Sequence, residues 1–357
     1  MAAVEMSRLL VSEDPATKVR ALESFVGAYD ASCGDSICQC LADGDMLVRE
    51  AAARALASAG DSVLPMAEQI AKLLVSGDMG ARCAAVEVLG ALASGAAPYA
   101  TSIAALLQED VQDASAAALA APCVAKKQKD ALRIPKCAAA EALPKLGPSG
   151  RSFAAAVAKL LDDKLPEVRC AAAASLGAMG AEGAAHEDAV MKALASERDP
   201  RAAAAAVHAL AEMGRARGPS SFEAVAAVVK LLSSQHPGVR SAAVRALGAA
   251  GEQAAPHMAK LFKCLSDRSP QVKIAAVGAL AELGPAGQVY AADVARLAHD
   301  EWQLPSARAA AIDALALMGD RGAAFEDEVA ELLADPSEEV QEAASRFLQS
   351  IGGGYYT

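Results

Sequence analysis

The chain has 357 residues, of which 54% are hydrophobic and 3% aromatic, and its formal net charge is −11. About a quarter of the residues are alanine, the best helix former, whereas aromatic and β-branched residues are scarce. This composition excludes a strand-rich fold and favours many closely packed helices. The negative charge argues against a nucleic-acid partner, which normally requires a basic face, and fits a protein that docks basic partners.

Hydropathy and cysteine usage bear on the compartment. We find no run of apolar residues long enough to span a membrane, and the N-terminus lacks a basic start followed by an apolar stretch. The eight cysteines are spread along the chain, and the cluster Cys33, Cys38 and Cys40 has no zinc-binding spacing. We therefore expect no metal and a reducing, intracellular and cytoplasmic setting, with an organelle left open.

A repeated pattern starts near Val48 and continues almost to the C-terminus: Val-Arg, two alanines, Leu and then Gly. Clear copies start at four dipeptides: Val48-Arg49, Val168-Arg169, Val239-Arg240 and Val272-Lys273. When the weaker copies are included, the start-to-start spacing is about 33 residues, apart from one gap of 54 between Ala81 and Pro135. Weaker copies start at Ala81, Pro135, Ala202, Ala307 and Val340, and a degenerate first copy at Val19-Arg20. The Val, second Ala and Leu lie on one helical stripe.

The sequence also indicates where the helices of each repeat begin and end. A proline precedes the stripe at five positions, where it is favoured as the first helical residue: Pro166, Pro200, Pro237, Pro270 and Pro305. The closing glycine suits a left-handed helix end. A second amphipathic stretch, such as residues 155–161, lies upstream of each stripe. The predicted unit is helix A, a turn and helix B, repeated about ten times in one all-α solenoid over residues 1–357.

The Leu-Leu-x-Asp element before the turn and the Val-Arg-x-x-Ala-Ala-x-x-Leu-Gly element after it resemble HEAT repeats. The form is similar to the short HEAT-like repeats of the phycobilisome-lyase type. The resemblance covers nearly the whole chain and implies an α-α superhelix. Such repeats serve many unrelated roles, so the resemblance alone does not identify a function.

The arginine after each Val lies near a helix N-terminus, where the helix dipole disfavours a cation. The turns before these helices carry Asp14, Asp43, Asp78, Asp163, Asp267 and Asp335. We therefore expect a structural Asp–Arg ladder along the solenoid, interrupted at Ala202-Ala203 and at Gln341. If its pairs are exposed, each contributes only about 0–1 kcal/mol.

An insertion at about residues 111–134 breaks the period in the fourth repeat. It is the most basic stretch of an acidic chain and carries Lys126, Lys127, Lys129 and Arg133. Insertions in solenoids often lie on a binding face, so the stretch is either a partner-docking loop or a tolerated solvent loop. We also expect a flexible tail at residues 352–357.

One position of helix B, six residues after the Val, varies between otherwise uniform Ala and Leu positions. It reads Arg54, Glu87, Glu141, Ala174, His208, Arg245, Gly278, Asp313 and Arg346. In HEAT-like solenoids the B helices line the concave surface, so this row is either a recognition surface or an unselected solvated face. Trp302, in a slightly lengthened turn, is a further exposed candidate for partner binding.

The sequence carries no phosphate-binding glycine loop, nucleophile elbow or set of His-Glu pairs for a di-iron centre. We predict a non-enzymatic protein–protein scaffold without a cofactor, which binds through the B-helix face and the basic insertion. The alternatives are a bilin-lyase-like chromophore protein, suggested by the repeat type alone, and a subunit that stabilises a larger assembly. The oligomeric state and the identity of the partner do not follow from the sequence.

Overall fold

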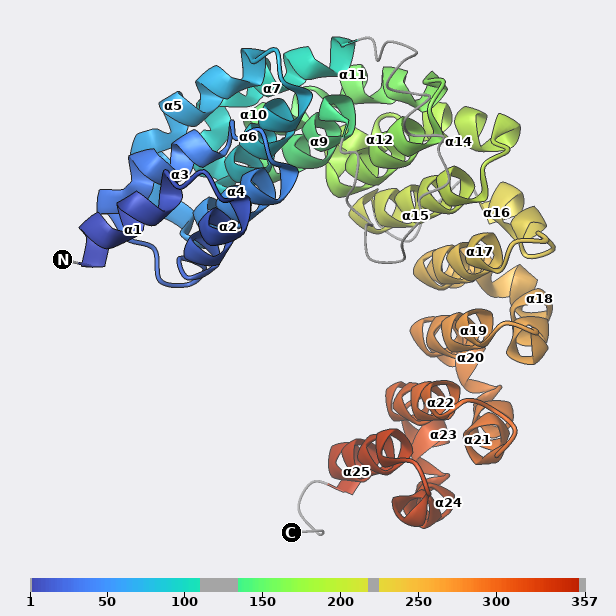
Figure 1. Cartoon of the computed structure of the whole chain (residues 1–357). Coiled ribbons are helices and arrows are strands. Elements are labelled where there is room, and N and C mark those ends of the chain that lie inside the picture. Colours follow the sequence, from blue (N-terminus) through green and yellow to red (C-terminus); the bar gives the residue numbers. More distant parts are fainter. Residues whose placement is uncertain (1, 110–133, 218–224, 353–357) are drawn as a thin grey trace. The chain divides into compact units, whose positions relative to one another are not determined.

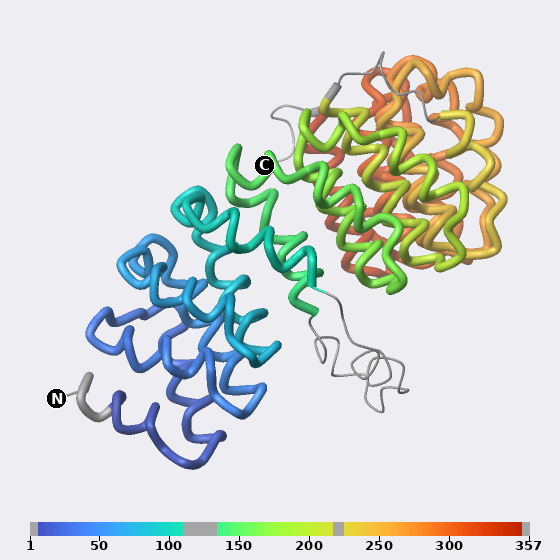
Figure 2. The backbone as a smooth tube through the Cα atoms, turned by 90° about the horizontal axis from the view of Figure 1, so that it is seen from above, coloured from blue at the N-terminus to red at the C-terminus, as the bar shows by residue number. Residues whose placement is uncertain are grey.

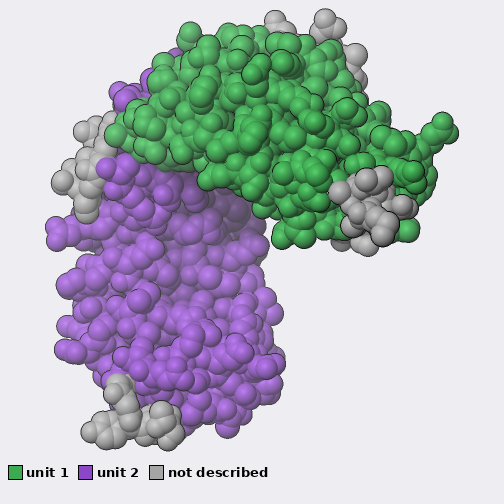
Figure 3. Space-filling view, turned by 90° about the vertical axis from the view of Figure 1, so that its left-hand side faces the viewer, with its two compact units in different colours: residues 1–182 green, residues 183–357 purple. Residues whose placement is uncertain are grey.

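The computed structural model describes residues 2–109, 134–217 and 225–352. The chain divides into two compact units, Met1–Glu182 and Gly183–Thr357, coloured green and purple in Figure 3. Every regular element in the described ranges is helical, which confirms the predicted all-α class. Each unit is a solenoid of HEAT-like helical hairpins. That all 357 residues form a single solenoid stays a prediction.

Unit 1 contains five hairpins, each made of a helix A followed by a helix B. They are α1 (Ala2–Leu10) with α2 (Pro15–Glu23), α3 (Gly34–Cys40) with α4 (Met46–Ser58), α5 (Ala67–Lys72) with α6 (Met79–Ala91), α7 (Ala100–Ala105) with α9 (Pro135–Ala142), and α11 (Ala154–Lys159) with α12 (Pro166–Ala178). Adjacent B helices pack on one another along the unit.

Unit 2 contains another five hairpins, which stack behind one another in Figure 2. They are α14 (Glu187–Ser196) with α15 (Pro200–Arg217), α16 (Val225–Leu231) with α17 (Pro237–Ala249), α18 (Met258–Lys263) with α19 (Pro270–Glu282), α21 (Ala291–His299) with α22 (Pro305–Leu317), and α24 (Glu326–Glu331) with α25 (Glu338–Gly352). In Figure 1 the B helices form one layer of this unit and the A helices the other. The described residues therefore hold the ten predicted hairpins.

Short helical turns connect or end these helices. They are η1 (Ala31–Cys33), η2 (Gly60–Met66), η3 (Leu73–Val75), η4 (Ala93–Tyr99), η5 (Leu106–Gln108), η6 (Leu143–Leu146), α10 (Pro148–Arg151), η7 (Leu160–Asp162), α13 (Ala181–Ala184), η9 (Gly251–His257), η10 (Cys264–Ser266), α20 (Pro285–Gln288), α23 (Asp320–Ala323) and η11 (Leu332–Ala334).

The predicted stripe forms the core. In α17 Val239 is 3% exposed, while Ala243 and Leu247 are fully buried. A Cβ on Gly248 would lie 2.8 Å from the α-carbon of Ala279, so the small residues let α17 and α19 approach closely.

Helix starts and ends also follow the sequence. The five predicted prolines begin α12, α15, α17, α19 and α22. Gly60, Gly180, Gly251 and Gly284 adopt positive φ angles after their B helices, as expected for closing glycines. Ala93 takes the same place after α6 with φ of 49°, a conformation that costs a non-glycine residue about 1–2 kcal/mol.

A charge ladder connects consecutive repeats. The basic residue near the start of one B helix contacts a carboxylate in the turn of the next repeat. Direct pairs of this kind include Lys18–Asp43 at 2.6 Å, Arg82–Glu109 at 3.2 Å, Lys136–Asp163 at 3.0 Å, Arg240–Asp267 at 2.7 Å, and Arg308–Asp335. The hydrogen bond from Arg240 lowers the pKa of the Asp267 carboxyl below its usual value.

Two details of the predicted ladder are wrong. The aspartate directly before a helix is not always a rung, because Asp14 and Asp78 instead accept hydrogen bonds from backbone N–H groups at the starts of α2 and α6. The first copy starts at Thr17-Lys18, not Val19-Arg20: Lys18 pairs with Asp43, whereas Arg20 is exposed.

Candidate protein-interaction surface

The row of variable B-helix positions lies at the surface of both units. Arg54 is exposed between Ala53 and Ala55, which are 1% and 0% exposed. His208 and Arg245 are exposed in unit 2, while Glu87 is half-buried in unit 1. We call the nine residues at this position, from Arg54 to Arg346, the B-helix row.

Within unit 2, two exposed arginines of the row make side-chain contacts with their neighbours. Arg245 donates a hydrogen bond of 2.9 Å to the Ser241 hydroxyl on its own helix. Arg346 of α25 pairs with Asp313 of α22 at 3.0 Å, with about half of each side chain exposed. Exposed pairs of this kind contribute about 0–1 kcal/mol, so a partner could exchange these contacts at little cost.

One charged group beside the row was not anticipated. Arg215 pairs with Glu212 and lies 3.8 Å from Glu282 of α19. It is helical because α15 continues through Gly214 to Arg217, whereas α17, α19 and α22 each have 13 residues. The helix-favouring stretch Arg215-Ala216-Arg217 before Pro219 was the signal in the sequence.

Residues 110–133, which include all of the basic insertion except Ile134, lie outside the described residues, and with them Lys126, Lys127, Lys129 and Arg133. The same holds for the tail after Gly352, while Gly352 itself ends α25. Lys136, which the sequence groups with these cations, is 8% exposed and pairs with Asp163. Its charge therefore belongs to the ladder.

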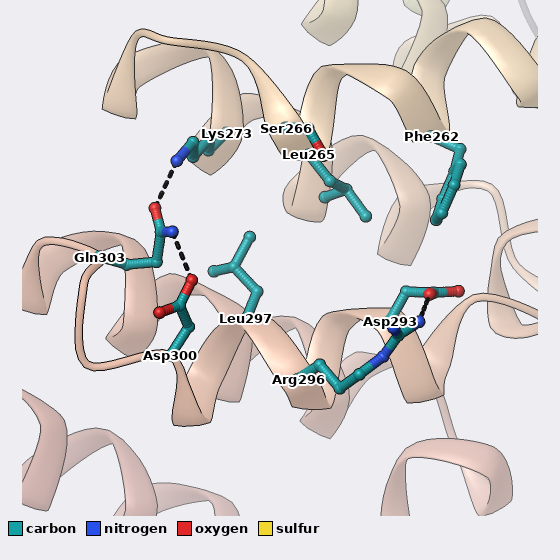
Figure 4. A pocket seen from close by; sticks show the side chains of 9 residues that line it. All are labelled: Phe262, Leu265, Ser266, Lys273, Asp293, Arg296, Leu297, Asp300 and Gln303. Atoms are coloured by element: carbon teal, nitrogen blue, oxygen red, sulfur yellow. Dashed lines mark hydrogen bonds and ion pairs between the residues drawn. The ribbon is translucent and has the colours of Figure 1, made fainter.

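A pocket of about 450 Å³ lies in unit 2 between the A helices α18 and α21 (Figure 4). It has a polar end, an apolar middle and a second end with an aromatic ring and an ion pair. The lining residues are, in that order, Lys273, Gln303 and Asp300, then Leu265 and Leu297, then Phe262, Asp293 and Arg296, with Ser266 completing the wall.

At the polar end, the cation and the aspartate of the charge ladder do not pair directly. Asp300 lies 27 positions after Lys273, as Asp267 does after Arg240, yet Lys273 donates its hydrogen bond to the Gln303 side-chain oxygen. The Gln303 amide nitrogen in turn donates to Asp300 at 2.6 Å. Pro305 follows Asp300 by five positions, whereas Pro270 follows Asp267 by three, so the two extra residues supply the intervening glutamine.

The same lengthened turn presents Trp302 to solvent. Its side chain is 96% exposed, and Leu304 beside it is 54% exposed. The Trp302 backbone N–H donates to Asp300 at 3.1 Å. The hydrogen bonds from Gln303 and Trp302 lower the pKa of the Asp300 carboxyl, which keeps this end of the turn negatively charged.

The buried cysteine thiols are suited to packing in the core and not to a reactive role. Burial raises the pKa of Cys38 and of Cys137 to about 12 and that of Cys264 to about 11, so these thiols stay protonated at neutral pH. Across residues 2–109, 134–217 and 225–352, no three His, Cys, Asp or Glu side chains are grouped as a metal site. No helix in these ranges has the length and hydrophobicity needed to cross a membrane.

Comparisons with known proteins agree with this architecture. Residues 187–263 match the family model for HEAT repeats. No curated protein matches the sequence of the chain.

Similar solved structures include the karyopherin Kap121p bound to the extreme C-terminus of the protein phosphatase Cdc14p, with a TM-score of 0.58 and 13% identity. Kap121p bound to Nup53p gives 0.57 and 14%, and Kap121p bound to the SUMO protease Ulp1p gives 0.58 and 13%. These alignments cover 97–98% of this chain and only 44–45% of Kap121p. At this identity the likeness concerns the fold.

Proposed function

We propose that this protein is a non-enzymatic scaffold that binds protein partners through the B-helix row, with the basic insertion as a second docking element. One observation carries the proposal: equivalent B-helix positions expose side chains of different charge, such as Arg54, Glu141 and Asp313, while the residues directly beside these three are apolar and buried. A partner lying along the helices would meet a patterned surface on a core that needs no rearrangement.

The similar structures add support of a general kind. In them Kap121p is bound to the extreme C-terminus of Cdc14p, to Nup53p or to Ulp1p, so a HEAT-like solenoid of this type can serve protein binding. We extend only this class of function to the present chain. We also infer an intracellular setting, since the thiols of Cys38, Cys137 and Cys264 are suited to a reducing environment.

Charge-reversal variants test which surface binds. Partners captured from extracts of the source cells by the wild-type protein would be compared with those captured by Arg245→Glu and by the triple variant Lys126→Glu, Lys127→Glu, Lys129→Glu. Lys260→Glu is the matched control, because Lys260 is exposed on the A helix α18.

We expect Arg245→Glu to weaken capture of at least one partner at unchanged melting temperature, while Lys260→Glu retains it. If the insertion also docks a partner, the triple variant lowers capture and makes the remaining binding less salt-sensitive. Equal loss in Arg245→Glu and Lys260→Glu would contradict the assignment of the row. If the triple variant instead melts at a lower temperature and still binds the partner, the insertion packs within the molecule.

A bilin-lyase-like role remains the alternative, together with a structural role in a larger assembly. A tetrapyrrole would need aromatic faces, but Phe262 and Tyr290 stack on each other with ring centroids 5.0 Å apart. An absorbance spectrum of the protein after incubation with a bilin separates the alternatives, because a shifted visible band would favour the chromophore role over the scaffold.

A further inference from the structure

We propose that the turn of residues 300–304 and the adjoining pocket form a further docking site, separate from the B-helix row and from the basic insertion, for a partner segment with an arginine beside an aliphatic residue. The arginine would stack on Trp302 and pair with Glu301, and the aliphatic side chain would enter the pocket. This site lies wholly within unit 2, at the end of the hairpin opposite the closing glycines.

Packing does not explain the indole of Trp302. Its side chain is 96% exposed, and Leu304 next to it is 54% exposed. Apart from its N–H bond to Asp300, which any non-proline residue could make, Trp302 has no role in holding the turn. Tryptophan is one of the side chains, with tyrosine and arginine, that are enriched at the energetic hot spots of protein interfaces.

The charge around the indole selects a cation. The face of an indole ring is electrostatically negative and attracts guanidinium or ammonium groups. Asp300 and Glu301 precede Trp302 directly, and Glu301 is exposed. A carboxylate-bearing segment would meet repulsion from all three groups, and the net charge of −11 adds to it. Arginine fits better than lysine, because its planar group can stack and form a two-pronged contact with a carboxylate.

The cations of the pocket do not oppose this assignment. Lys273 is held by Gln303 and lies in the field of Asp300 and Asp267. Arg296 at the far end is paired with Asp293. Between them, Leu265 and Leu297 form an apolar middle (Figure 4). A volume of about 450 Å³ accommodates one aliphatic side chain with its flanking backbone.

Trp302 is the single tryptophan of the chain, so its fluorescence reports directly on the proposed site. The full-length protein would be titrated with the blocked peptide acetyl-Gly-Leu-Arg-Gly-amide, and in parallel with acetyl-Gly-Leu-Glu-Gly-amide. We expect a saturable change in Trp302 emission with the arginine peptide, with Kd in the millimolar range typical of weak, short ligands, and weakening as salt is added. The glutamate peptide should give no saturable change.

Two pairs of variants sharpen the test. Glu301→Gln should weaken the arginine peptide by about 3- to 10-fold, as expected when an interfacial charge partner is lost, while Glu252→Gln, an exposed change in η9, leaves it unaltered. Trp302→Leu should abolish the heat of binding measured by calorimetry, whereas Arg245→Glu retains it. Retention in Arg245→Glu also separates this site from the proposed function of the row.

Three outcomes would overturn the proposal. The first is the absence of a saturable response to the arginine peptide up to about 10 mM, a concentration that detects even very weak sites. The second is equal or tighter binding of the glutamate peptide, which would mean that Lys273 is the binding group. The third is unchanged affinity in both Glu301→Gln and Trp302→Leu.

Discussion

Two consecutive junctions in unit 2 start from the same ladder motif and end differently. Between α17 and α19, Arg240 donates two hydrogen bonds to Asp267 at 2.8 and 2.7 Å and two more to the carbonyls of Ser234 and Gln235. Between α19 and α22, Gln303 separates Lys273 from Asp300. The cation and the aspartate are 27 positions apart at both junctions. We therefore infer that turn length decides whether they pair directly, as a closed rung of the ladder, or through Gln303, as an open rung.

The difference shows how a repeat protein can gain a site without disturbing its core. Two additional residues leave the helical stripe of α22 intact, since Ala307, Ala311 and Leu315 are still 0–1% exposed. The extra length is absorbed in the turn, where it opens a pocket and exposes Trp302. Stability and recognition therefore reside in different parts of the same hairpin.

The largest effect should come from the core that both junctions share. Leu247→Ala in α17 removes a fully buried side chain and should lower the free energy of unfolding by about 2–5 kcal/mol. Chemical denaturation followed by circular dichroism measures this loss. A loss smaller than that of Arg240→Gln would show that the charges outweigh the stripe.

The closed and open rungs should differ next. Arg240→Gln leaves Asp267, whose side chain is 14% exposed, without its charged donor and should cost about 1–3 kcal/mol. This exceeds the roughly 0–1 kcal/mol expected for an exposed pair, because the rung is mostly buried. Lys273→Gln removes a bond to a neutral amide and should cost about 0–1 kcal/mol. Equal losses in matched denaturation curves would contradict the distinction between the junctions.

Acid should weaken the closed rung specifically. Arg240 lowers the pKa of Asp267 below its ordinary value of 3.8, so the folded state takes up this proton less readily than the unfolded state. The stabilisation is therefore present above pH of about 4 and lost as pH falls through the lower folded-state value. Thermal melts of the wild type and Asp267→Asn should differ most at about pH 5–7 and converge toward pH of about 2–3. A constant gap across that range would refute the assignment.

The smallest effect belongs to the exposed turn. Trp302→Ala should change the free energy of unfolding by no more than about 0.5 kcal/mol, as is usual for surface substitutions, because the side chain is 96% exposed. Differential scanning calorimetry provides the measurement. A loss above about 1.5 kcal/mol, beyond the range of ordinary surface changes, would mean that Trp302 packs within the folded chain and is unavailable to a partner.

The sequence predicts what a single repeat determines. Proline starts, glycine ends and the Val-Ala-Leu stripe follow from local helix chemistry, and all three are found at the predicted residues. Contacts between repeats were harder, because the ladder pairs depend on how one hairpin is offset against the next. Lys18 was missed since Val19-Arg20 resembles the motif more closely, although Asp14 lies four positions before Lys18, as Asp45 lies before Arg49.

The sequence predicts those parts of the candidate surfaces that lie within one repeat, and not those that form where two repeats meet. Exposure of Arg54, His208 and Arg245 follows from helical periodicity, and the lengthened turn of Trp302 is visible by counting residues. The pocket beside it was not predictable, since Phe262, Leu265 and Leu297 come from two repeats and meet only after stacking. The extension of α15 to Arg217 does not follow from the repeat, because Gly214 stands where other copies have their closing glycine and the helix nevertheless continues through it.

The central claim is that the B-helix row contacts a protein partner, and site-specific photo-crosslinking tests it most directly. A benzophenone amino acid would replace Arg245 or His208 of the row, or Lys260 of α18, and the protein would be irradiated in extracts of the source cells. We expect discrete adducts from both row positions and little from Lys260. Adducts that are equally strong at Lys260, or absent from both row positions, would contradict the claim.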